Sequence, residues 1–293
     1  MIEFAPEVEE ARRDDRPIVA LETTLVAHGF PDAEGLDVAL EAERRVRAAG
    51  AAPATVGVVD GHVRVGLSAP ELERFAEAGV AARKVGPRDL AAAVVSRSLG
   101  ATTVGGTLAV CAVAGIRFIG TGGIGGVHRG FADRPDVSAD LGELSRTRAL
   151  VVSSGIKSLL DVPATLEVLE TLGVPVLGWR TDRLPLFYAA GGGPPAPESV
   201  GTAKEAAAIA RSHWSLGRAG LLLAQPPSES LDVEPLIEAA LADAEANAVT
   251  GQDVTPFVLA HIHRETGGAS VRVNKQLIAD NAALAADVAV AFG

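Results

Sequence analysis

A glycine-rich segment followed by charged residues is the strongest sign of chemistry in this sequence. Six glycines lie between Gly120 and Gly130, directly after an apolar run, residues 116–119, that predicts a buried strand. Glycine lets a ligand approach the main chain, so this loop predicts backbone N–H groups that line an anion site. Charged residues follow at short intervals: His128, Arg129, Asp133, Asp136 and Asp140. The combination suits a phosphorylated ligand with a divalent metal. The alternative is a flexible, charged surface loop. The strand before the segment and the helix-like run after it both argue against that alternative.

Two further residues have the type and placement for catalysis. Glu22 stands at the end of a strand predicted over residues 17–21, where α/β sheets bind their ligands; a hydrogen-bonded edge carboxylate is the alternative. Lys157 is one of four lysines among 26 basic residues and lies in an apolar setting after a strand predicted over residues 149–152. Lysine, unlike arginine, can lose its proton and act as a nucleophile. An exposed lysine at a helix start is the alternative, which the helix dipole disfavours.

Two more places could hold an anion. Lys84 lies in a basic run, residues 83–89, ahead of a helix predicted over residues 90–99. Thr107 closes a Gly-Gly-Thr turn between a strand predicted over residues 101–104 and a helix predicted over residues 108–114. For the basic run at residues 83–89, the alternative is a run of solvated surface charges.

The remaining pattern alternates strands with helices and predicts an α/β fold: three α/β/α layers around a central, mostly parallel sheet. Asp60-Gly61 predicts a hairpin over residues 56–65, and Ser68 with Glu71 forms a capping-box pattern. Helices are expected over residues 6–13, from Asp32 to about 49, and over 163–172, 202–216, 233–247, 257–265 and 273–292. Strands are expected over residues 174–178 and 221–224. The length, 293 residues, fits one large α/β domain, residues 1–293.

The composition bears on which partners the protein binds and on where it is located. The net charge of −11 argues against nucleic acid or an anionic membrane surface as a partner, so an anionic ligand needs a local cationic cluster. The single cysteine, Cys111, excludes a disulfide framework and lies in an apolar run. No signal peptide and no segment long enough to cross a bilayer is evident, so a cytoplasmic location is expected.

Several separated segments together resemble the pseudouridine-5′-phosphate glycosidase family, almost from end to end. The most specific is the string Gly-Gly-Ile-Gly-Gly-Val-His-Arg-Gly, residues 122–130, beside Asp-Val-Ser-Ala-Asp, residues 136–140. The others include Leu-Glu-Thr-Thr at residues 21–24, Lys-Val at 84–85, Gly-Ala-Thr-Thr-Val at 100–104, Lys-Ser at 157–158 and Thr-Pro-Phe at 255–257. Gly86-Pro87 departs from the more basic pair expected in the family.

The resemblance implies reversible cleavage of pseudouridine 5′-phosphate to uracil and ribose 5-phosphate, in pseudouridine catabolism. It places a covalent sugar adduct on Lys157, proton transfer on Glu22 and a divalent metal, usually Mn²⁺, on Asp136. The substrate contacts that it implies are Lys84, Val104, His128, Ser138, Ala139, Asp140 and Asn274, to which the turn at Thr107 adds a hydroxyl. It also implies a homotrimer.

Two other classes of protein fit parts of the pattern. A sugar kinase or an aldolase-like enzyme would also bind a sugar phosphate, but a kinase needs an ATP site and the sequence has no P-loop pattern. A non-catalytic nucleotide-binding module is the second alternative. Turnover of pseudouridine 5′-phosphate distinguishes all three.

Overall fold

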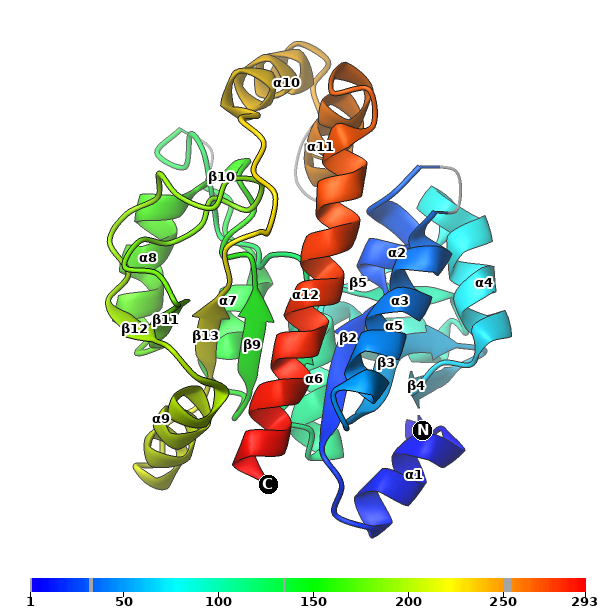
Figure 1. Ribbon diagram of the computed structural model, residues 1–293. Coiled ribbons are helices and arrows are strands. Elements are labelled where there is room, and N and C mark those ends of the chain that lie inside the picture. Colours follow the sequence, from blue (N-terminus) through cyan, green and yellow to red (C-terminus); the bar gives the residue numbers. More distant parts are fainter. Residues whose placement is uncertain (1, 32–33, 134, 250–253) are drawn as a thin grey trace.

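The computed structural model describes residues 2–31, 34–133, 135–249 and 254–293 as a sheet covered by helices on both faces (Figure 1). In these residues the main sheet has eleven strands, nine of them in the order β1-β4-β3-β2-β7-β9-β13-β11-β12, while β6 pairs with β3 and with β5. Among the strand pairs of this sheet in the described residues, only β3–β4 and β3–β6 are antiparallel. The predicted three-layer α/β/α fold with a mostly parallel sheet is confirmed.

The strands are short and mostly buried, as expected where helices cover both faces. Their bounds are β1 Ile2–Phe4, β2 Ile18–Glu22, β3 Ala52–Val59, β4 His62–Val65, β5 Arg83–Val85, β6 Gly100–Thr102, β7 Phe118–Gly120, β9 Leu150–Ser153, β11 Val176–Trp179, β12 Glu198–Val200 and β13 Leu221–Ala224. A separate antiparallel pair joins β8 Val127–His128 to β10 Leu160–Asp161.

Helices α3 and α9 both pack against α12 on one face of the sheet, and α6 packs with α7 on the other (Figure 1). The helix bounds are α1 Pro6–Arg13, α2 Thr24–His28, α3 Gly35–Ala48, α4 Ala69–Ala78, α5 Leu90–Val95, α6 Val104–Ala114, α7 Ala139–Leu144, α8 Val162–Thr171, α9 Ala203–Ser215, α10 Glu234–Ala246, α11 Val254–Glu265 and α12 Ala269–Phe292. None of the helices in the described ranges is long and apolar enough to cross a membrane.

Helix α12 lies unusually close to the sheet. A Cβ atom at Gly120 would lie 2.8 Å from the Cα atom of Ala282, so glycine on β7 and alanine on α12 are what permit this approach. The amide of Asn281, one residue earlier, donates to the carbonyl of Thr121 at 2.8 Å. Helix α12 is therefore fixed to the point where β7 leaves the sheet.

Several predicted boundaries are wrong. Residue Val104, predicted to end a strand, opens α6 instead, because Thr103 caps that helix by accepting from the N–H of Gly106 at 3.1 Å. Helix α5 ends at Val95 rather than at residue 99, and α12 begins at Ala269 rather than at residue 273. Strands β1, β5 and β12 were not predicted. Asp32, predicted to begin the third helix, lies outside the described residues.

Candidate active site

Three adjacent strands carry the candidate catalytic groups at the same edge of the sheet. Strand β2 ends at Glu22, β7 is followed by Thr121, and the loop after β9 contains Lys157. Because β2, β7 and β9 are parallel neighbours, their carboxyl ends meet, which is where open α/β sheets bind ligands.

Glu22 is almost completely buried, with 4% of its surface exposed. Its Oε1 accepts a hydrogen bond from the hydroxyl of Thr121 at 2.5 Å. Burial raises the pKa of the Glu22 carboxyl, and the nearby ammonium of Lys157 and the Thr121 hydrogen bond offset this only in part. Glu22 therefore holds its proton to a higher pH than an ordinary glutamate, a property that suits an acid/base group.

The loop that carries Lys157 is fixed by the glycine-rich loop beside it. The N–H of Lys157 donates to the carbonyl of Ile124 at 3.1 Å, and the N–H of Ile124 donates to the carbonyl of Gly155 at 3.1 Å. Gly155 has φ of +78°, and a Cβ atom there would lie 2.8 Å from the carbonyl oxygen of Pro185. The turn that positions Lys157 therefore requires glycine at residue 155.

The glycine-rich loop, predicted to line an anion site, donates one amide, that of Gly125, to one of the protein's own carboxylates. Asp140 accepts from the N–H of Gly105 at 2.7 Å through Oδ1 and from the N–H of Gly125 at 2.8 Å through Oδ2. Asp140 is buried, with 6% of its surface exposed, and it also lines the pocket described below.

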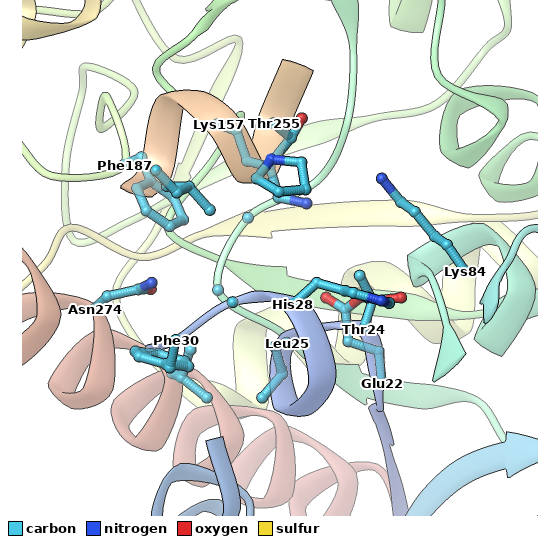
Figure 2. Close-up of a pocket in the computed structure, with 16 residues that line it drawn as sticks. Glu22, Thr24, Leu25, His28, Phe30, Lys84, Lys157, Phe187, Thr255 and Asn274 are labelled. Carbon is cyan, nitrogen blue, oxygen red and sulfur yellow. The ribbon is translucent and has the colours of Figure 1, made fainter. Parts of the chain in front are cut away.

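Two pockets meet at this edge and share five residues: Glu22, Thr24, Lys84, Lys157 and Thr255. The first, which we call the apolar chamber, has about 530 Å³ of empty volume when the open solvent at its mouth is included. Its walls include Leu25, His28, Phe30, Phe187, Leu259, Asn274 and Ile278. In Figure 2, Phe187, Asn274 and Phe30 lie toward one end of this chamber and Glu22 and Lys84 toward the other.

The second pocket, which we call the polar compartment, is wider and carries most of the predicted substrate and metal residues. Besides the shared residues, its walls include His128, Asp136, Ser138, Ala139 and Asp140. Ser138 caps α7 by accepting from the N–H of Asp140 at 3.2 Å, which fixes the start of this run.

His128 and Asp136 lie together on one wall of the polar compartment. The N–H of His128 donates to the carbonyl of Asp136 at 3.0 Å, and the side-chain atoms His128 Nε2 and Asp136 Oδ2 are 3.9 Å apart. Burial lowers the pKa of His128, while Asp136 acts in the opposite direction. His128 therefore tends to be the neutral imidazole unless an anion approaches it.

A hydrated divalent ion fits this donor set, but a cage made wholly of protein does not. Within the described ranges no three His, Cys, Asp or Glu side chains converge as metal ligands. Asp140 already accepts from two amides, whereas Asp136 is partly exposed and its Oδ2 lies 3.9 Å from His128 Nε2. Hard ions such as Mg²⁺ and Mn²⁺ accept one carboxylate, with water and substrate oxygens completing the shell.

Two predicted contact residues lie behind the wall rather than in it. Val104 and Thr107 are both buried on α6, and neither is among the residues that line the apolar chamber or the polar compartment. The hydroxyl of Thr107 lies 3.0 Å from that of Thr102, so it supports the inner end of the site. The geometry gives no direct ligand contact to either side chain.

The comparisons with known proteins agree with the motifs. A family model described as indigoidine synthase A-like protein matches residues 7–291. A curated relative from Herpetosiphon aurantiacus, named pseudouridine-5′-phosphate glycosidase, is 48% identical over 99% of this chain and 97% of its own. The chain belongs to this indigoidine synthase A-like family. The resemblance inferred from the motifs is thereby confirmed.

Solved members of the indigoidine synthase A-like family share the whole fold. A prealnumycin C-glycosynthase, solved in complex with ribulose 5-phosphate, superimposes with a TM-score of 0.89 at 37% identity, covering 100% of this chain and 97% of its own. An indigoidine synthase A-like protein from Thermotoga maritima also gives 0.89, at 36% identity and 99% and 96% coverage.

Sequence reasoning missed some residues of the site. Thr121 is the hydrogen-bond partner of Glu22 although 99 positions separate them. Phe187 closes the apolar chamber from an irregular segment with φ of +58°, which no local pattern announces. The parallel order of β2 and β7 is the signal that could have paired Thr121 with Glu22.

We predict that Glu22→Gln stabilises the protein at alkaline pH. The unfolded carboxyl has a pKa near 4.5, below that of the folded one, so the wild type loses stability as pH rises from 4.5 through the raised folded pKa. Glutamine does not ionise, and the variant should therefore melt at a higher temperature than the wild type at pH 8, with the difference vanishing near pH 4.

Glu41→Gln is the control with the opposite sign. Hydrogen bonds from Arg44 and Arg45 lower the pKa of Glu41 to about 2, so its ionised form stabilises the fold at pH 8 and the variant should melt lower there. Thermal unfolding followed by circular dichroism measures both. A Glu22→Gln variant that melts below the wild type at pH 8 would contradict the assignment of Glu22 as a buried group with a raised pKa.

Proposed function

We propose that this protein cleaves, reversibly, the carbon–carbon glycosidic bond of pseudouridine 5′-phosphate to give uracil and ribose 5-phosphate. The observation that carries the proposal is that Glu22 and Lys157 both line the apolar chamber and the polar compartment, at the junction of the two pockets. The chain is also 48% identical to a relative that bears the name of this activity.

The two pockets match the two halves of that substrate. We assign the planar base to the apolar chamber, where Phe30, Phe187 and Ile278 provide apolar contacts. The amide oxygen of Asn274 has no hydrogen-bond partner among the described residues, so it is available to a base N–H. The sugar phosphate then occupies the polar compartment, and C1′ lies at the junction.

Breaking a carbon–carbon glycosidic bond calls for an amine. No oxygen or nitrogen leaves the sugar, so the usual route by two carboxylates to an oxocarbenium ion is poorly suited. In our proposal the C1′–O4′ bond opens, with O4′ taking a proton, and the Lys157 amine adds to C1′. The C1′–C5 bond then breaks, its electron pair remaining with the uracil, while the Lys157 nitrogen forms an imine with C1′. Water hydrolyses the imine and releases ribose 5-phosphate.

Glu22 supplies the proton that the uracil carbon needs. Burial raises its pKa, so it holds its proton to a higher pH than an ordinary glutamate, and the Thr121 hydroxyl holds the orientation of its carboxyl. In the direction of synthesis the same carboxylate takes that proton back.

The phosphate is assigned to Lys84 and His128, with the run Ser138-Ala139-Asp140 beside the sugar. Both Lys84 and His128 line the polar compartment. A phosphate there would raise the pKa of His128, whose burial otherwise disfavours the charged form.

Asp136 would hold the divalent ion, which we propose to be Mn²⁺. When bound, such an ion supplies positive charge and ordered water next to the base and sugar. His128, beside Asp136, fixes the wall on which the ion would sit. The homotrimer and the cytoplasmic location remain predictions from the resemblance and the composition.

Turnover of pseudouridine 5′-phosphate in the presence of Mn²⁺ tests the proposal. The wild type should release uracil, measured by chromatography with absorbance detection. Lys157→Met should lower the rate by at least ~10³-fold, as expected when a nucleophile is removed. Lys204→Met, on the exposed side of α9, is the matched control and should retain full activity. Absence of uracil release by the wild type, or full activity of Lys157→Met, would refute the proposal.

Asp136→Asn should weaken the metal site without unfolding the protein. The loss of one carboxylate charge should raise the Mn²⁺ concentration for half-saturation by roughly tenfold or more. Electron paramagnetic resonance of free Mn²⁺, with substrate analogue present, measures this concentration directly. Asp133→Asn, on the same loop, is the control; equal Mn²⁺ affinity in the two variants would exclude Asp136 as the ligand.

A further inference from the structure

Arg129, the cation next to His128 in the glycine-rich segment, does not line the apolar chamber or the polar compartment. Strand β8 ends at His128, which lines the polar compartment, and Arg129 is the first residue after that strand. Arg129 instead lines a separate surface pocket with Ser158, Leu160 and Glu234.

The guanidinium of Arg129 holds the main chain on the far side of Lys157. It donates to the carbonyl of Ser158 at 2.7 Å through Nη2 and, more weakly, to the carbonyl of Leu160 at 3.4 Å through Nε. The N–H of Leu160 in turn donates to the carbonyl of Lys157 at 3.0 Å. With the Ile124 contact described above, residues of one loop hold the Lys157 segment on both sides.

The same guanidinium binds a carboxylate on another element. Arg129 donates to Glu234 from Nη1 at 2.6 Å and from Nη2 at 3.2 Å, and Glu234 is the first residue of α10. Arginine is the side chain that can bind two carbonyls and a carboxylate at once, because its donors form a rigid planar fork. Lysine cannot reproduce this arrangement.

Helix α10 connects this contact to the roof of the apolar chamber. It packs against α11, and both stand beyond the carboxyl edge of the sheet (Figure 1). Helix α11 contributes Thr255, Pro256 and Leu259 to the walls of the chamber. The pair formed by α10 and α11, which we call the cap, thus touches the catalytic lysine segment through Arg129.

We propose that Arg129 is a positioning residue that couples the Lys157 segment to the cap through Glu234. When the cap is seated, Glu234 orients the guanidinium, and the guanidinium orients the carbonyls that flank Lys157. A pair this exposed contributes little to global stability, so its effect is local order at the catalytic segment and the roof. The kinetic consequence rests on the proposed function, whereas the structural coupling does not.

Hydrogen exchange of the free protein tests the coupling independently of any activity. Glu234→Gln keeps the shape and removes the charge, and should speed amide exchange in both α11 and residues 156–161 by roughly threefold to fivefold. Arg129→Lys keeps the charge but loses the fork, and should speed exchange in residues 156–161 by at least as much.

Glu7→Gln is the matched control. It breaks another two-pronged Arg–Glu pair of similar exposure, that between Glu7 of α1 and Arg47 of α3, which touches neither the cap nor the lysine segment. It should leave exchange in both regions unchanged. The proposal would be overturned if Glu234→Gln speeded amide exchange in α10 alone. It would also be overturned if Glu7→Gln and Glu234→Gln had equal effects on exchange in residues 156–161.

Kinetics supply a second readout if pseudouridine 5′-phosphate proves to be the substrate. Glu234→Gln should raise KM by roughly threefold to fivefold with kcat little changed, and Arg129→Lys should lower kcat by roughly tenfold, the loss expected for one charge-assisted hydrogen bond. A purely structural role would instead lower the melting temperature and leave both constants at their wild-type values. Failure of turnover in the wild type refutes the proposed function but leaves the exchange result intact.

Discussion

Two hydrogen bonds to the carboxylate of Asp140 hold helix α6 and the glycine-rich loop in a fixed relative position. One reaches Gly105 on α6 and the other reaches Gly125 in the glycine-rich loop, so a single buried side chain ties that helix to the loop. The loop in turn holds Lys157 through Ile124. Since a buried carboxylate is costly unless its hydrogen bonds are satisfied, this junction permits little variation in geometry. The position of the lysine relative to the edge of the sheet follows from it.

At the carboxyl edge of the sheet, ionisable side chains lie where burial disfavours their charged forms. Glu22 is buried at the end of β2 and accepts a hydrogen bond from Thr121, and its burial raises the pKa of its carboxyl. That cost to stability is also what makes a carboxyl group useful as a proton donor near neutral pH. In the proposed function, the apolar chamber on one side of Glu22 and Lys157 receives the base, and the polar compartment on the other side receives the sugar phosphate.

Much of the fold could be predicted from the sequence, because helix and strand patterns, caps and short motifs are local. The predicted capping box of Ser68 with Glu71 begins α4, and β13 has the predicted ends. The packing role of the glycines could not be predicted. They are needed because the protein's own side chains fill the space: a Cβ at Gly125 would lie 2.2 Å from the hydroxyl of Ser138, and one at Gly123 would lie 2.7 Å from the ring of Phe187. Such contacts join distant segments, and neither composition nor spacing reveals them.

The central claim is that the amine of Lys157, and no other lysine, forms the bond to the sugar. Ribose 5-phosphate and borohydride, added together, should reduce the imine to a stable secondary amine, and peptide mapping by mass spectrometry locates it. The account predicts one reduced sugar phosphate per chain, on the peptide that contains Lys157, and none in Lys157→Met. Labelling of Lys84 at the same rate, or a fully labelled Lys157→Met protein, would contradict it.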